Sequence, residues 1–383
     1  SFAGNKTPQG NQDGNDIGDF YYAPPSGFLS LCTSNLPSVD VIPSEHFQTR
    51  LITGTGASNT QVITGFPFAP DFVWIKNRSS AYNHAVYDTV RGASNRLYSN
   101  LTNAEASNAA LSAFSSEGYT VGTDAANENN VVSWNWKAGG SASSNTNGTI
   151  TSSVSANVDA GFSILTYTGS GSAGTVGHGL SKIPDMIITK GRSNSGQWVT
   201  WHKDLTGAFA SNGGYAYLNS TGAAATTTVF YDGTGFTSSV FKWRGGNENV
   251  NQSSRTYLSY CFHSVDSYSK VGSYIGNGNV DGPFVNCGFK PAYILAKVAS
   301  SQLNAAGWQI YDTARGTFNP VDDYLFADSS GAESASAATY FAADILSNGF
   351  KIRAANTYGM NQSGATYIFL AFAETPFKFS NAR

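Results

Sequence analysis

The side chains best suited to chemistry are an aspartate and an arginine that lie three residues apart in two similar phrases of the sequence. The pairs are Asp88 with Arg91 and Asp312 with Arg315. At this spacing the guanidinium can pair with the carboxylate across a turn, and the carboxylate can also accept backbone N–H bonds. The related segment 201–207 lacks the arginine, and its aspartate is shifted. Because a repeated active site would not tolerate that loss, we interpret both pairs as structural turns.

A second candidate is a polar loop that directly follows a tryptophan. Its members are Trp243, Arg244, Asn247 and Asn249. An aromatic ring can cover the apolar C–H face of a sugar while amide groups bind its hydroxyls. We therefore treat these four residues as a candidate ligand-binding site for a glycan, with packing of the tryptophan in a β-sandwich core as the alternative.

Residues for catalysis or metal binding are sparse. Glycan hydrolysis needs two carboxylates about 5 to 10 Å apart, whereas the adjacent Asp322 and Asp323 would point to opposite faces of a strand. The five histidines and three cysteines show no metal-ligand spacing. The turn at 13–19 resembles the opening of a calcium loop but lacks its closing glutamate. The sequence therefore predicts no enzyme, no cofactor and no metal site.

The elements that must position these residues recur three times along the chain. Each copy has a Gly-x-Gly phrase, then a proline, then a hydrophobic segment that ends in a lysine. The three lysines are Lys76, Lys190 and Lys297. The period is roughly 110 residues, which is the size of a domain rather than of a solenoid repeat.

Short runs of β-branched and aromatic residues between turn residues predict strands in every copy. The best candidate for a helix is residues 103–111, and it would be short. We therefore expect an all-β fold of three tandem β-sandwich-like repeats, preceded by an extended N-terminal arm or partial domain.

Composition divides the chain into five segments. They are an arm or partial domain at 1–45, a repeat at 46–140, a Gly/Ser/Asn-rich linker at 141–148, and repeats at 149–270 and 271–383. The linker is expected to be flexible unless a neighbour holds it. Because the second and third repeats have no such linker between them, we expect these two to pack rigidly together.

Charge and hydropathy exclude several classes of function. Charged residues are 12% of the 383 residues, about half the usual share, and the net charge is −3. Such a chain has no broad positive field for nucleic acid. No apolar stretch approaches the roughly 20 residues that cross a bilayer, and residues 1–19 do not resemble a signal peptide. We expect neither nucleic-acid binding, nor membrane insertion, nor secretory export.

Several phrases resemble a family of virion structural proteins of tailed bacteriophages that is common in marine phages. They are the phrases at residues 70–78, 87–92, 133–140 and 371–377. The resemblance covers almost the whole chain. Residues 20–28 are similar to the end of a SPRY-type domain that often precedes the repeats in that family. The resemblance thus implies that 1–45 is the end of a truncated SPRY-type domain.

The resemblance implies a virion surface component, such as a tail or head fibre, that contributes to attachment to a host-surface glycan. Composition agrees, because fibres assembled in the reducing host cytoplasm need neither disulfides nor a signal peptide. Appendages of this kind are commonly homotrimers, which gain avidity from weak sites. One alternative is a capsid or tail decoration or scaffold protein that binds only other virion proteins. A glycan depolymerase is a more distant one.

Overall fold

The structure is a computed structural model, and it describes most of the chain. The described residues are 6–35, 39–56, 58–108, 110–124, 127–206, 214–226, 230, 235–300, 307–335, 342–354 and 359–373. Their regular elements are strands and the short 3-10 helices η1 (Thr33–Asn35), η2 (Pro43–Glu45) and η4 (Lys203–Thr206). The fold is all-β, as predicted. Residues 374–377, the end of the phrase 371–377, lie outside the described residues.

Each repeat contributes one large antiparallel sheet whose four central strands have the same order. In unit 1, the described part of 46–140, they are β1 (Phe47–Thr55), β9 (Glu128–Trp136), β3 (Phe72–Asn77) and β4 (Ala85–Asp88). In unit 2, from 149–270, they are β12 (Phe162–Thr168), β19 (Thr256–Phe262), β14 (Met186–Gly191) and β15 (Val199–His202). In unit 3, from 271–383, they are β20 (Ser269–Ile275), β28 (Thr366–Ala373), β22 (Pro291–Val298) and β23 (Gln309–Asp312). The first of these strands begins two residues before the predicted start of the unit.

The large sheets of units 2 and 3 continue beyond these four strands. Unit 2 adds β10 (Ser143–Asn145) and β11 (Ser152–Asn157) at one edge, and β16 (Gly214–Tyr217) and β17 (Ala225–Thr226) at the other. Unit 3 adds β24 (Asp323–Phe326) and β25 (Ser334–Ala335). The predicted linker 141–148 therefore contains strand β10, and it is held by a neighbour, which is the condition under which we did not expect it to be flexible. Pairing of Ser144 with Ser153 holds this segment in the sheet.

A smaller sheet covers the outer face of each large one. These sheets are β2 (Gln61–Ile63), β8 (Gly118–Val121) and β7 (Leu111–Ser115) in unit 1; β13 (Gly174–Gly177) and β18 (Val240–Trp243) in unit 2; and β21 (Phe284–Asn286), β27 (Gly349–Ile352) and β26 (Ala343–Leu346) in unit 3. Unit 1 also has a short pair, β5 (Asn95–Arg96) with β6 (Ala106–Ser107). The helix considered at 103–111 is thus wrong, because β6 and the start of β7 occupy it.

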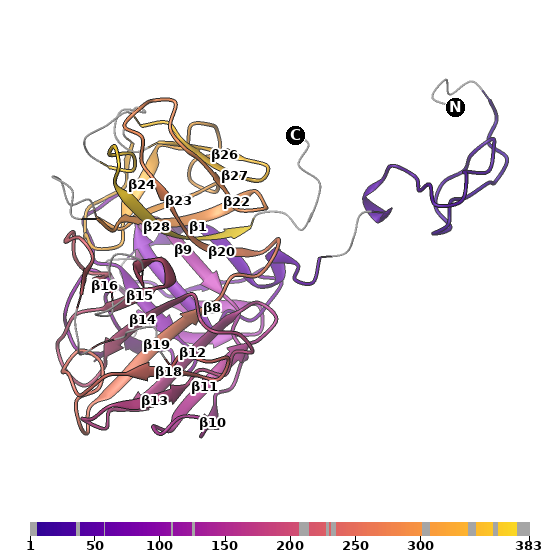
Figure 1. The fold of residues 1–383 in the computed structure, drawn as a ribbon. Coiled ribbons are helices and arrows are strands. Elements are labelled where there is room, and N and C mark those ends of the chain that lie inside the picture. The colour runs from indigo at the N-terminus through magenta and orange to yellow at the C-terminus, as the bar shows by residue number, and fades with distance from the viewer. Residues whose placement is uncertain are drawn as a thin grey trace.

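The inner faces of the three large sheets pack against one another. Along β3, alternation sends Val73 and Ile75 into the outer core of unit 1, and Phe72 and Trp74 into a core that also contains residues of units 2 and 3. Strands buried on both faces are continuous hydrophobic runs, which explains the repeated segments ending in lysine. The three units therefore form one body around a shared core, whereas residues 6–35 lie apart from it (Figure 1).

Candidate functional site

Three equivalent hydrogen bonds show that the units close into a ring. In each unit, the side chain just before the fourth strand of the large sheet donates to a backbone carbonyl of the preceding unit. The bonds are Trp198 Nε1 to Tyr98 O at 2.8 Å, Trp308 Nε1 to Tyr217 O at 2.9 Å, and His84 Nε2 to Phe326 O at 2.9 Å. They link unit 2 to unit 1, unit 3 to unit 2, and unit 1 to unit 3. We call the three contact regions corner 1/2, corner 2/3 and corner 3/1.

The Asp88–Arg91 pair lies fully buried at corner 1/2. Arg91 Nε is 2.6 Å from Asp88 Oδ2, and the Arg91 backbone N–H donates to Asp88 Oδ1 at 2.9 Å. Tyr260 of unit 2 also donates its hydroxyl to Asp88 Oδ2, at 2.8 Å. Glu105 then joins Arg91, at 2.9 Å, to Arg192 of unit 2, at 2.7 Å. The turn is therefore one half of an ionic contact between two units.

Corner 3/1 repeats this arrangement with different residues. Arg315 Nε is 2.6 Å from Asp312 Oδ2, which also accepts a 2.9 Å hydrogen bond from Trp134 Nε1 of unit 1. Glu333 lies 2.9 Å from Arg315 and 2.6 Å from Arg78 of unit 1. Both predicted turn pairs thus face the neighbouring unit in the same way.

Corner 2/3 has the same backbone contact without the charges. Ala224 N donates to Ala299 O at 2.9 Å, just as Glu105 N donates to Arg192 O at 2.8 Å and Glu333 N to Arg78 O at 2.9 Å. His202 and Leu205 stand where the other turns have aspartate and arginine. Leu370, which has no donor, replaces the tyrosine or tryptophan that faces the aspartate elsewhere.

The electrostatics fit a structural role for both ion networks. Burial alone would raise the pKa of Glu105, but hydrogen bonds and charge from Arg192 and Arg91 lower it below its usual value. Glu333 has a lowered pKa for the same reason, through Arg78 and Arg315. Asp88 and Asp312 are buried away from solvent, so neither can reach a substrate. Both corners hold the ring closed and offer no site for a reaction.

The lysine that ends each repeated strand is also structural. Lys76, Lys190 and Lys297 are buried, and burial lowers the pKa of each to about 8. Each ammonium donates to a backbone carbonyl, at distances of 2.6 Å, 2.8 Å and 3.0 Å. Lys76 and Lys190 thus satisfy carbonyl groups where their own strands end, whereas Lys297 donates to Ser220 O of unit 2.

The loop predicted to bind a glycan does not offer its tryptophan. Trp243 is 0% exposed, because alternation along β18 places it with Phe241 in the core of unit 2. The Asn249 side chain is buried and accepts the backbone N–H of Gln197 at 2.7 Å. Arg244 and Asn247 are partly exposed nearby. The prediction of an exposed ring beside these amides is therefore wrong, and core packing explains the tryptophan.

Other positions with possible chemistry are accounted for locally. The Asp13 carboxylate accepts N–H groups of Asn15, Ile17, Ser30 and Asn35, which makes the 13–19 segment a hydrogen-bonded turn. Within the described residues, no group of three or more histidine, cysteine, aspartate or glutamate side chains could hold a metal ion. That same part of the chain contains no helix long and apolar enough to span a bilayer.

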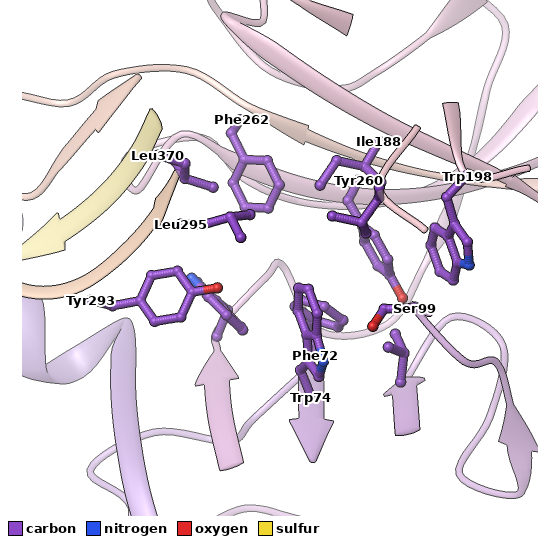
Figure 2. A pocket seen from close by; sticks show the side chains of 13 residues that line it. Phe72, Trp74, Ser99, Ile188, Trp198, Tyr260, Phe262, Tyr293, Leu295 and Leu370 are labelled. Carbon is purple, nitrogen blue, oxygen red and sulfur yellow. The ribbon is translucent and has the colours of Figure 1, made fainter. Parts of the chain in front are cut away.

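A small cavity lies in the shared core, between residues of all three units (Figure 2). Its volume is about 20 Å³, which is roughly the space of one water molecule. Aromatic and aliphatic side chains such as Phe72, Tyr260 and Leu295 line it. It is therefore a packing gap within the shared core and is too small for an organic ligand.

Sequence reasoning found the turns but missed their partners. Glu105 and Glu333 lie in irregular segments with no recognisable motif. A signal existed for Arg78 and Arg192, since both come two residues after the repeated lysine, where unit 3 has Ala299. Reading that signal would have required knowing which unit contacts which.

The family described as Domain of unknown function (DUF7483) matches residues 42–376. The match includes all three units and leaves out nearly all of the N-terminal arm. No curated protein matches the chain in a sequence comparison.

Proposed function

The chain belongs to the DUF7483 family, and we propose that it is a bacteriophage virion structural protein. In this proposal it is a tail- or head-fibre-type component of the virion surface, assembled in the host cytoplasm, that contributes to attachment to a host-surface glycan. It acts without catalysis or a cofactor.

The observation that carries the proposal is the closed ring of three β units. A body with a shared core, and with ion networks buried between its units, is suited to rigid display of a surface. The phrases that resemble phage virion proteins support the same role. Residues 70–78, 87–92 and 133–140 lie in or beside β3, β4 and β9, which build the core and two corners of the ring. Those phrases therefore serve architecture.

A role in binding other virion proteins alone is the second candidate, and the N-terminal arm favours it. Tyr22, Phe28 and Leu31 are 64%, 69% and 102% exposed. Exposed apolar groups of this size gathered on one short segment commonly mark a contact with another protein. In both candidates the arm attaches the chain to a virion partner, and they differ in whether the ring also binds a glycan.

The homotrimer stays part of the proposal. One chain already supplies three β units around a shared core, so formation of that core does not require other copies of the chain. Avidity for a ligand, in contrast, does require several copies. Light scattering of the purified protein measures its mass directly. A mass of three chains supports the homotrimer, and a mass of one chain contradicts it.

The decisive test of the proposed function is whether the protein is part of the particle. Phage particles purified from cells that carry the gene would be labelled with an antibody against the chain and imaged. We expect label at a fixed place on head or tail, and competition by the purified chain in host adsorption. Protein found only in the lysate and absent from particles would end the proposal. Label on particles without any effect on adsorption would favour the decoration role.

A further inference from the structure

A groove on the large sheet of unit 2 is rich in hydroxyl groups. Its volume is about 360 Å³, and it lies over β10, β11, β12 and β19. The hydroxyl side chains on its surface are Ser144, Thr151, Ser153, Thr166, Thr168 and Thr256. Within the described chain none of these six hydroxyls has a hydrogen-bond partner. The groove lining contains no acidic residue.

Strand pairing arranges the hydroxyls regularly. Ser144 pairs with Ser153, and Ser153 pairs with Thr166, so these three form a row across three strands. Thr168 pairs with Thr256 in a second row. Neighbouring strands are about 4.8 Å apart, and alternate residues along a strand are roughly 7 Å apart. The groove therefore presents an ordered set of groups, each of which can both donate and accept.

One guanidinium lies at the side of this groove. Arg192 donates through Nε and one terminal nitrogen, Nη2, to the two oxygens of Glu105, at 3.0 Å and 2.7 Å. This bidentate pair fixes the plane of the guanidinium. The other terminal nitrogen, Nη1, has no partner among the described residues, and the side chain is 22% exposed. A guanidinium N–H donor in a fixed orientation is thus available beside the hydroxyls.

The other two units do not offer this surface. Leu51 of unit 1 stands at the position of Thr166, and Ile275 of unit 3 stands at the position of Thr168. Both are exposed, at 46% and 64%. Only unit 2, within the described residues, has the additional strands β10 and β11 that widen the sheet here.

We propose that this groove binds an acidic oligosaccharide, with Arg192 on the carboxylate of a sugar residue and the hydroxyl rows on the sugar hydroxyls. The inference rests on the proposed attachment function and replaces the loop at Trp243 as its binding site. A guanidinium N–H forms its strongest hydrogen bonds with a carboxylate, and groups that both donate and accept match a polyhydroxylated ligand. Because no exposed aromatic ring lines the groove, each site binds weakly, and attachment depends on several copies.

A matched pair of variants tests the inference. Arg192→Gln and Arg78→Gln each break a bidentate pair with a glutamate, and the two arginines are 22% and 21% exposed. Only Arg192 lines the groove. Binding of a galacturonic acid tetramer and of its methyl ester would be measured by NMR titration, after an array of acidic and neutral glycans. Thr166→Val provides a second variant that keeps the β-branched shape.

We expect the acidic tetramer, or another carboxylate-bearing saccharide from the array, to bind about tenfold more weakly to Arg192→Gln, which loses a charged hydrogen bond. Arg78→Gln should bind like the wild type, and Thr166→Val about threefold more weakly. The methyl ester should bind both arginine variants and the wild type equally. Equal loss in Arg192→Gln and Arg78→Gln, or no binding of any acidic saccharide, would overturn the inference. Even if the inference were overturned in this way, the proposed function would still be supported by label on the particles and by competition of the purified chain in host adsorption.

Discussion

Corners 1/2 and 2/3 join neighbouring units through the same backbone contact but with opposite chemistry. The first contains a buried network of Asp88, Arg91, Glu105 and Arg192, whereas the second has His202, Leu205, Ala224 and Ala299 at the same positions. In corner 2/3 all four charged residues are replaced, and Leu370 replaces Tyr260, which donates to Asp88 in corner 1/2. Replacing a buried ion network by apolar residues is tolerated when it is complete. The molecule thus carries both solutions to one packing problem.

The comparison also shows why a corner cannot contain only part of the ion network. A buried aspartate needs its arginine and a second donor, Tyr260 or Trp134, to satisfy its oxygens. Leu370 cannot supply that donor, so an aspartate in place of His202 would be buried without sufficient partners. The histidine there remains neutral and accepts the backbone N–H of Asp204 at 3.1 Å.

The largest expected effect comes from breaking one charged corner in part. Arg315→Met removes the arginine partner of Asp312 and one of the two arginine partners of Glu333, and leaves the buried Asp312 carboxylate without a counter-ion among the described residues. We expect a loss of about 3 to 5 kcal/mol in the free energy of unfolding. Urea denaturation measures it. The control is Arg353→Met, whose pair with Asp344 has an arginine side chain that is 40% exposed, and which should cost less than about 1 kcal/mol. Equal effects would refute the distinction between buried and exposed pairs.

Acid should weaken the neutral corner before the charged ones. Burial lowers the pKa of His202 to about 4, although Asp204 opposes the shift. Since a histidine in the unfolded chain titrates near 6.5, the unfolded state binds the extra proton first as the pH falls. The contribution of His202 is complete above pH 6.5 and is lost toward pH 4, by about 3 kcal/mol at most. Glu105 and Glu333 have lowered pKa values, so their contribution is lost only below about pH 4.5.

His202→Asn isolates this effect, because an amide oxygen can accept the same N–H without titrating. The measurements are urea denaturation between pH 7 and pH 4 and hydrogen exchange of the Asp204 amide. We expect a shallower pH dependence in the variant. In the acidified wild type we expect lower protection of the Asp204 amide, measured against its intrinsic exchange rate at each pH. The four other histidines also have lowered pKa values through burial and titrate in both proteins. Identical pH dependence of the two proteins would contradict the prediction.

The smallest effect should come from the most extensive change. Corner 1/2 would be converted to the neutral type by five substitutions: Asp88→His, Arg91→Leu, Glu105→Ala, Arg192→Ala and Tyr260→Phe. We expect a loss below about 2 kcal/mol, because no charge or hydroxyl is left buried without a partner. Arg91→Leu alone should cost more than all five together. A combined loss equal to the sum of the single losses would show that the residues act independently.

Local sequence features predicted the strands, the three repeats and the two turn pairs. These features could be predicted because their causes are local: β-branched runs, turn residues and an Asp-x-x-Arg phrase act over a few residues. Pairing of Asp88 with Arg91 needs only the turn between them. The glycan loop was predicted by the same kind of reasoning and failed, because whether Trp243 points inward depends on the small sheet that covers unit 2.

By itself the sequence determined an all-β chain of three similar units, with a lysine closing one buried strand in each. Only the tertiary structure decided that the units form a closed ring, because the contacts that close it join residues 178 to 255 positions apart. Glu333 meets Arg78, and Asp312 meets Trp134, only when unit 3 returns to unit 1. No local sequence pattern predicts such a contact, because the two residues become neighbours only in the folded chain.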